Sequence, residues 1–183
     1  MVIADPWKNL KTAPTMDRHP MFEDEYLHYY KLQYGMDYVA LRYANGYGPR
    51  QSPHGEAGVV AIFISKMQKG ETPIIYGDGL QTRDYLFVDD VVACNVQALR
   101  DDVSGVFNVG TGVESSVVDL FRAIRSSLGT ACEEIHGPAK SGEVRRSALR
   151  SLRLKDVMGI EPRIHLAEGI QKRVEWFKEK KFA

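Results

Sequence analysis

The feature that most constrains this chain is the alternation of short apolar runs with longer segments whose apolar residues recur at helical spacing. Short runs bounded by glycine, proline and acidic residues are typical of buried strands, and the periodic segments are typical of helices. We expect strands at residues 38–44, 73–76, 85–88, 105–110 and 134–136. We expect helices at residues 22–34, 59–68, 89–100, 116–128, 151–158 and 166–180. Strands that alternate with helices predict an α/β domain.

Two of the expected helices have starts that the sequence marks. Ser116 with Asp119 three residues later forms a capping-box pattern. Asp89 or Asp90 stands where a side chain would cap the helix at 89–100. We therefore expect side-chain caps at both helix starts.

Composition narrows the class of protein. The 183 residues are 44% hydrophobic, which suits one globular domain with a buried core. Cys94 and Cys132 are too few for a disulfide framework or a zinc site, so we expect two buried thiols and no metal. No stretch reaches the ~20 apolar residues that span a bilayer, and the N-terminus lacks a secretion-signal pattern. We expect a cytoplasmic protein without a membrane segment.

The net charge of zero hides a basic C-terminal quarter. Residues 140–183 carry 12 Lys and Arg against 6 Asp and Glu. Much of this excess lies in "IQKRVEWFKEKKFA", where a solvated helix face explains it. Because no basic stripe with interleaved aromatic residues accompanies it, we expect no nucleic-acid partner.

Residues 1–20 differ from the rest of the chain. They carry three prolines and show no sustained period, which indicates an irregular leader. Regular structure is expected to begin near Met21, so the expected domain covers residues 21–183.

The glycines at 110–115, "GTGVES", invite comparison with a dinucleotide-binding loop. Ser115 stands where that fingerprint requires its last glycine. The segment does follow an expected strand and precede an expected helix, a place where a phosphate can bind. We interpret it as a plain strand-to-helix turn.

The stretch "YGDGLQTRDYLFVDD", residues 76–90, carries the strongest candidate for ligand binding. Arg83 follows a glycine turn, and a guanidinium presents a rigid fork of donors that fits phosphate oxygens. Asp84 stands beside it, where its carboxylate would orient the fork. The competing interpretation is a surface Arg-Asp pair worth less than about 1 kcal/mol.

The order of five motifs then identifies a family resemblance. The motifs are "LRYANGYGPRQSPHGEAGVVAIFI", "IYGDGLQTRDYLFVDDVV", "VFNVGTG", "KSGEVRRS" and "GIEPRIHLAEGI". In sequence and spacing they resemble the C-terminal half of extended short-chain dehydrogenase/reductase enzymes, in particular the NAD-dependent UDP-glucose and UDP-N-acetylglucosamine 4-epimerases. The resemblance covers residues 21–183. It implies an α/β substrate-binding part of that fold, with residues 21–45 a remnant of the Rossmann half.

The resemblance assigns roles to residues on both sides of the expected sugar. Asn45 matches the asparagine that contacts diphosphate and sugar, and Tyr43 and Ala44 match the residues near the nicotinamide. Arg83 matches the arginine that binds the diphosphate, and Tyr85 matches the aromatic residue beside the ribose.

The same resemblance assigns the base and a second phosphate contact. Val59 and Val60 match the helix start whose backbone meets the uracil, and Tyr76 matches the wall against the base. Lys140 and Glu143 stand where the family usually has arginine and aspartate. Both keep the charge sign, but lysine loses the bidentate geometry.

The family's chemistry requires groups that the resemblance does not place in this sequence. The Tyr-x-x-x-Lys pair would fall at Met16 and Pro20, neither of which acts as an acid or base. A Gly-rich NAD loop is also missing. We expect a truncated chain that binds a UDP-sugar without NAD and without catalysis, although the intact family uses NAD.

Association is the last expectation. Without a Rossmann half, Tyr26, Tyr30, Val39 and Leu41 would leave an apolar patch and an open strand edge, which favours a homo-oligomer, most simply a dimer. Three alternatives remain open. The leader with its Trp7 covers the patch, the chain is a non-enzymatic interaction module, or it is half of a split epimerase that needs a Rossmann partner.

Overall fold

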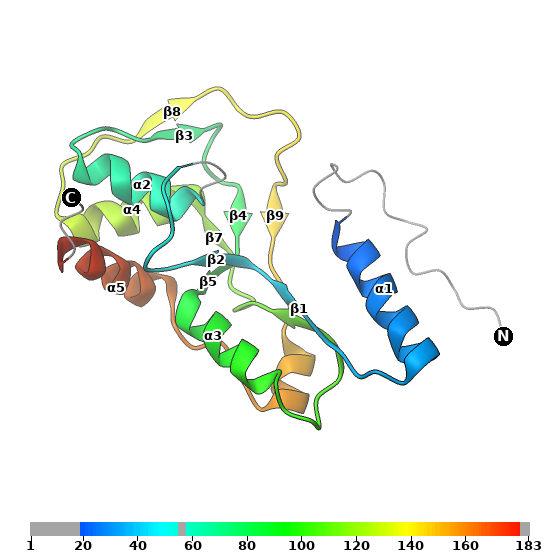
Figure 1. Cartoon of the computed structure of the whole chain (residues 1–183). Coiled ribbons are helices and arrows are strands. Elements are labelled where there is room, and N and C mark those ends of the chain that lie inside the picture. Colours follow the sequence, from blue (N-terminus) through cyan, green and yellow to red (C-terminus); the bar gives the residue numbers. More distant parts are fainter. Residues whose placement is uncertain (1–18, 55–57, 180–183) are drawn as a thin grey trace.

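The computed structural model describes residues 19–54 and 58–179, and Figure 1 shows their arrangement. The helices are α1 (His19–Tyr34), α2 (Val59–Gln68), α3 (Val88–Gln97), α4 (Val117–Leu128) and α5 (Leu166–Glu179), with a π-helical turn η2 (Leu154–Met158). The strands are β1 (Val39–Tyr43), β2 (Asn45–Tyr47), β3 (Ile74–Tyr76), β4 (Thr82–Arg83), β5 (Tyr85–Phe87), β6 (Gly105–Val109), β7 (Ser115–Ser116), β8 (Ile135–Gly137) and β9 (Arg146–Ser147). The expected α/β alternation is confirmed.

The strands pair into small, mostly parallel sheets. β1 pairs with β6, β2 with β5, and β3 with β8, each in parallel. β4 lies between β7, which is antiparallel to it, and β9, which is parallel to it. The parallel pairs join segments far apart in sequence, and this brings the expected site residues within reach of one another.

Two hydrophobic cores lie on opposite sides of β5. Because side chains alternate along a strand, Tyr85 and Phe87 enter the first core and Leu86 enters the second. The first core gathers α2, α4 and α5, which lie together in Figure 1. The second gathers β6, α3 and η2 and includes Leu86, Cys94, Phe107, Val109, Leu154 and Met158. A fully buried side chain of this size contributes about 1.5–3 kcal/mol.

Helix α1 stands apart from both cores in Figure 1. Arg42 forms an ion pair with Asp24, and Lys31 donates to Asp37 and Ser104, so polar contacts hold it to the rest of the chain. The structure describes it from His19, three residues before the expected helix at 22–34, and its acidic residues lie beyond the first turn.

Two helix starts test the expected caps. At α4 the capping box is confirmed, because Asp119 N donates to Ser116 Oγ and Ser116 N donates to the Asp119 carboxylate. The cap expected from Asp89 or Asp90 is wrong, because α3 starts one residue earlier, after Phe87. The Asp90 carboxylate instead accepts from the backbone N–H groups of residues 163 and 164 and so anchors the segment before α5.

Other expectations are corrected in detail. Cys94 is buried as expected, but Cys132 is only half-buried. Val39 and Leu41 are half-buried against the second core rather than fully exposed. The expected leader, with Trp7, lies outside the described residues. The described part of the chain has no helix long and apolar enough to cross a membrane, and it has no cluster of metal-ligating side chains.

The capping box yields a stability prediction. We expect Ser116→Ala to lower the free energy of unfolding by about 1 kcal/mol, because the Asp119 N–H loses its acceptor. Urea denaturation measures the change. Ser126→Ala, at an exposed position near the end of the same helix, is the control and should shift stability by less than about 0.5 kcal/mol. Equal losses in the two variants would contradict the assigned cap.

Candidate functional site

The three-stranded sheet of β7, β4 and β9 fixes the position of Arg83. Arg83 Nη1 donates to the carbonyl oxygens of Thr82 at 2.8 Å and Val144 at 2.7 Å. Its Nη2 lies 3.7 Å from Glu143 Oε1, and the side chain is 19% exposed. Two carbonyls and one carboxylate therefore hold the guanidinium at the surface of the sheet, and the ion pair confirms that Arg83 and Glu143 come together.

A cavity of about 210 Å³ lies beside this ion pair. Lys140 extends over the ring of Tyr76, with its Nζ 4.2 Å from the ring centroid. This distance permits a cation–π interaction that holds the ammonium above the ring. The cavity joins residues from β3, the turn after it and the segment before β9, namely Tyr76, Gly77, Asp78, Gln81, Ala139, Lys140, Glu143 and Arg145.

Gln81 and Arg145 are members of this cavity that the sequence analysis missed. Gln81 Nε2 donates to the Tyr76 carbonyl at 3.1 Å and to the Glu143 carboxylate at 3.4 Å. Alternation along the chain was the available signal, because Gln81 stands two residues before Arg83. Arg145 binds Asp78 with two hydrogen bonds of 2.7 Å, and this partner lowers the pKa of Asp78 to about 2.

Tyr85 and Asn45 lie opposite each other on β5 and β2. The Asn45 N–H donates to the Asp84 carbonyl at 2.9 Å, and Asn45 itself is exposed. Tyr85 is 4% exposed, and its ring meets that of Tyr47 edge-on at 6.3 Å between centroids. Its hydroxyl has no hydrogen-bond partner among the described residues, and burial raises the pKa of Tyr85 to about 12.

The start of α2 carries Val59 and Val60. Val60 is 2% exposed, and Val59 is half-buried. Gly58 occupies the N-cap position without a side-chain cap, so no side chain at that position accepts from the first-turn N–H groups. Such a helix start offers backbone donors to a ligand.

Tyr43 and Ala44 lie apart from the Tyr76 cavity. Tyr43 lines a separate hollow of about 740 Å³ between β1 and α3, and burial raises its pKa. The Ala44 N–H donates to the Val109 carbonyl at 2.9 Å, and its side chain packs on the second core. The structure thus separates the expected nicotinamide side from the base side.

The role expected for Asp84 is wrong. Its carboxylate is 1% exposed and does not orient Arg83. Asp84 Oδ1 accepts from Thr111 N at 3.0 Å and Thr111 Oγ1 at 2.6 Å. Asp84 Oδ2 accepts from Gly112 N at 3.0 Å and Leu149 N at 3.2 Å. Asp84 lies between β4 and β5, and its partners at residues 111, 112 and 149 differ from the Thr82, Val144 and Glu143 partners of Arg83.

This carboxylate also determines whether the turn at 110–115 suits a dinucleotide. A phosphate there would need the N–H groups of Thr111 and Gly112, and Asp84 already accepts from both. A Cβ at Gly110 would collide with the Asp84 carboxylate, so the side chain rather than a ligand requires this glycine. The N–H groups of Thr111 and Gly112 therefore do not suit a phosphate, and the segment leads from β6 through the short strand β7 into α4.

Comparisons with known proteins agree with this architecture. The UDP-glucose 4-epimerase of Mycolicibacterium smegmatis is 49% identical over 156 residues, which are 85% of this chain and 50% of the relative. The crystal structure of UDP-glucose 4-epimerase from Thermotoga maritima with UDP-glucose has a TM-score of 0.84 at 43% identity, covering 87% of this chain and 52% of that one. The UDP-N-acetylglucosamine 4-epimerase from Methanobrevibacter ruminantium, in complex with UDP-N-acetylmuramic acid, has a TM-score of 0.86 at 31% identity, covering 97% and 59%.

The α/β fold is therefore that of short-chain dehydrogenase/reductase epimerases, as the resemblance implied. A sequence model of the NAD dependent epimerase/dehydratase family matches residues 19–110. This chain belongs to that family. It spans about half the length of the curated relatives that it matches.

The Asp84 carboxylate yields the second prediction. We expect Asp84→Asn to lower the free energy of unfolding by about 2–4 kcal/mol, because a neutral amide cannot accept from four donors and leaves partly buried N–H groups unpaired. Urea denaturation measures the loss. Asp101→Asn, at an exposed turn, is the matched control and should cost less than about 0.5 kcal/mol. A near-neutral Asp84→Asn would show that this carboxylate does not organise the fold.

Proposed function

We propose that this chain binds the nucleotide diphosphate of a UDP-sugar and does not catalyse epimerisation by itself. The observation that carries the proposal is the convergence of Tyr76, Arg83, Lys140 and Glu143 from distant segments beside one small cavity. Lys140 over the Tyr76 ring, with the Arg83–Glu143 ion pair beside the cavity, matches a ligand with a planar base, ribose hydroxyls and two phosphates. Names of the relatives support the same ligand class, since one solved relative contains UDP-glucose.

Each contact in the proposed complex has a physical reason. Arg83 and Lys140 supply the positive charge that a diphosphate requires, and Arg83 already has a fixed orientation. Glu143 accepts a hydrogen bond from a ribose hydroxyl, and Tyr76 packs against the base. The first-turn N–H groups at Val59 and Val60 bind the polar edge of the uracil. Asn45, which is exposed on β2, faces the sugar, and Tyr85 lies buried behind this part of the site in the first core.

The absence of catalysis by the chain alone rests on the NAD that hydride transfer requires and on the tyrosines that could transfer a proton. Hydride transfer in this family requires NAD, whose phosphates do not fit the turn at residue 110. Proton transfer requires a group with a pKa near neutrality. Burial raises the pKa values of Tyr43, Tyr47 and Tyr85, so none of them exchanges a proton readily at neutral pH.

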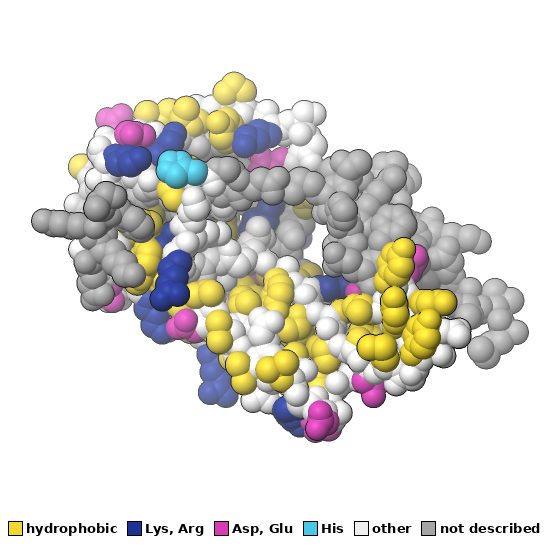
Figure 2. Space-filling model, in the orientation of Figure 1, with side chains coloured by type: hydrophobic (Ala, Val, Ile, Leu, Met, Phe, Trp, Pro, Cys, Tyr) yellow, Lys and Arg dark blue, Asp and Glu magenta, His cyan; other side chains and the backbone are white. Residues whose placement is uncertain are grey.

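Exposed apolar side chains favour a second candidate role, that of an assembling subunit. On α1, Tyr26 is 68% and Leu32 74% exposed. Figure 2 shows apolar side chains gathered over α1 and over the face that carries α3. In the described part of the chain, β1 and β6 form a two-stranded sheet. The edge of β1 that does not face β6 is open to a further strand. A second copy of this chain or a subunit with a Rossmann half fits this face.

Calorimetry with UDP and with NAD separates the candidate functions. We expect UDP to bind the chain alone, NAD not to bind it, and UDP-glucose not to be epimerised with NAD present. Arg83→Ala should weaken UDP binding by about 1–3 kcal/mol, because a charged hydrogen-bond donor to phosphate is lost.

Arg146→Ala is the matched control for this measurement. Arg146 lies on the neighbouring strand β9 and binds Glu114 at the surface, so its loss should leave UDP affinity within about twofold. Failure of both UDP and NAD to bind would support a non-enzymatic module. Uptake of NAD only with an added Rossmann subunit would support a split enzyme. Turnover by the chain alone would overturn the proposal.

The exposed face of α1 predicts self-association. We expect size-exclusion chromatography with light scattering to report a dimer at micromolar concentration. Replacing Tyr26 and Leu32 with lysine should shift the chain toward monomer, because the apolar area that drives association is lost. Lysine at the exposed residues Val113 and Val157, which lie outside α1, is the control. A stable wild-type monomer would contradict the prediction.

A further inference from the structure

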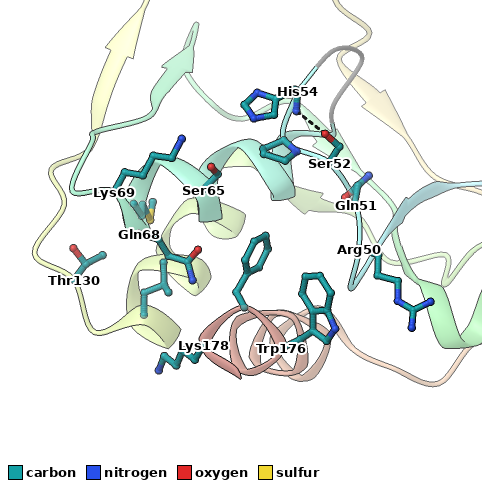
Figure 3. Close-up of a pocket in the computed structure, with 14 residues that line it drawn as sticks. Arg50, Gln51, Ser52, His54, Ser65, Gln68, Lys69, Thr130, Trp176 and Lys178 are labelled. Carbon is teal, nitrogen blue, oxygen red and sulfur yellow. Dashed lines mark hydrogen bonds between the residues drawn. The ribbon is translucent and has the colours of Figure 1, made fainter. Parts of the chain in front are cut away.

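A cavity of about 1020 Å³ lies on another part of the molecule, between α2, α5 and the segment at 50–54. Figure 3 shows Ser65 and Gln68 on α2, with Lys69 directly after it, above the space, and Trp176 and Lys178 on α5 below it. Its described lining shares no residue with the cavity beside Tyr76. A volume of this size is within the range of cavities that hold small organic molecules.

The lining has two distinct parts. The indole of Trp176 rises from α5 into the space in Figure 3, and further apolar groups come from Pro53, Met67, Leu128 and Phe177. Aromatic and aliphatic walls of this kind accept a flat apolar body. Burying the apolar surface of the ligand and of these walls away from water also lowers the free energy of binding.

The polar part of the lining is basic. Arg50, Lys69 and Lys178 border the cavity, and none of its described lining residues is Asp or Glu. In Figure 3 these three side chains come from three different elements around the opening. Charges of one sign in a cleft with low-dielectric walls raise the local concentration of ions of the opposite sign.

Arg173 adds positive charge behind the wall. Its side chain is fully buried, and its Nη2 donates to the Gln51 carbonyl at 2.6 Å. The guanidinium carbon lies 4.2 Å from the Phe177 ring centroid and 5.4 Å from that of Trp176. Nε and Nη1 have no hydrogen-bond partner among the described residues. No described carboxylate forms an ion pair with it.

A buried cation of this kind has an electrostatic consequence. Burial lowers the pKa of Arg173 to about 10, so the guanidinium remains charged at neutral pH. A buried charge that has no counter-ion among the described residues interacts strongly with an ion that approaches it through a low-dielectric interior. Trp176, Phe177 and Gln51 belong both to its surroundings and to the cavity lining, so its field reaches the cavity.

We propose that this cavity is a second ligand site, for a small organic anion with a flat aromatic body. The aromatic body lies against Trp176 and Phe177, and the anionic group faces Lys69, Lys178 and the charge of Arg173 behind the wall. The proposal does not depend on UDP binding, because the two sites share no described lining residue.

Anilinonaphthalene sulfonate, an aromatic sulfonate whose fluorescence rises on binding, is the probe that tests the site. We expect saturable binding with energy transfer from Trp176, and loss of that transfer in Trp176→Phe. The printed sequence has one other tryptophan, Trp7, so the transfer is measured in a Trp7→Phe background, where Trp176 is the donor. Dye that binds in this background without energy transfer from Trp176 would lie elsewhere and would overturn the proposal.

Charge variants test the basic part of the site. At the exposed positions 69 and 178, the double variant Lys69→Glu with Lys178→Glu should raise the dissociation constant of the probe at least tenfold. Lys69→Arg with Lys178→Arg keeps the charge and should keep the wild-type dissociation constant. Arg150→Glu with Arg163→Glu makes the same charge change at exposed positions outside the cavity, and it should leave the dissociation constant of the probe within twofold of the wild-type value. Circular dichroism checks that each variant is folded.

Competition separates this site from the proposed nucleotide site. Saturating UDP should leave the energy transfer from Trp176 unchanged. Displacement of the probe by UDP would show that the cavity belongs to the nucleotide site. Equal loss of affinity in the two charge-reversal pairs would show that net charge, rather than this cavity, binds the dye.

Discussion

The buried carboxylate of Asp84 is the contact on which the arrangement of the site depends. It accepts hydrogen bonds from residues 111, 112 and 149, which come from the turn after β6 and the segment after β9. A buried carboxylate requires several donors to offset its desolvation, so the two segments must stay in place around it. Removing Asp84 would therefore release both the turn at 110 and the segment around β9, which carries Glu143 toward the site.

The contact that Asp84 makes in the interior also positions Arg83, the neighbouring residue, at the proposed binding surface. Asp84 is buried and Arg83 is partly exposed, so these two adjacent residues fix the interior and present a guanidinium at the surface. Arg83 donates to the Val144 carbonyl and forms an ion pair with Glu143. Both residues belong to the segment that Asp84 anchors at Leu149. Binding and stability are thus coupled through one dipeptide. A ligand that binds Arg83 contacts a strand whose position the Asp84 hydrogen bonds already fix.

Local pattern was sufficient for most of the fold and for part of the site. The helical period at 117–128 and the capping pair Ser116 and Asp119 are contacts within four residues, so the sequence predicts them. The roles of Asp84 and Asp90 were missed because their partners lie 27 to 74 residues away, where spacing carries no signal. The family resemblance placed Arg83 near Glu143, which no local rule predicts. The basic cavity around Trp176 is formed by three distant segments and has no motif.

The glycine at position 110 has a consequence for how tolerance to substitution is understood in this chain. A side chain there would displace the carboxylate next to Arg83, so alanine at this position should be as harmful as a change in a ligand contact. Nothing bound needs to touch it. A mutational scan would therefore mark residue 110 as essential, and an observer who equated sensitivity with proximity to substrate would draw the binding pocket around the wrong turn.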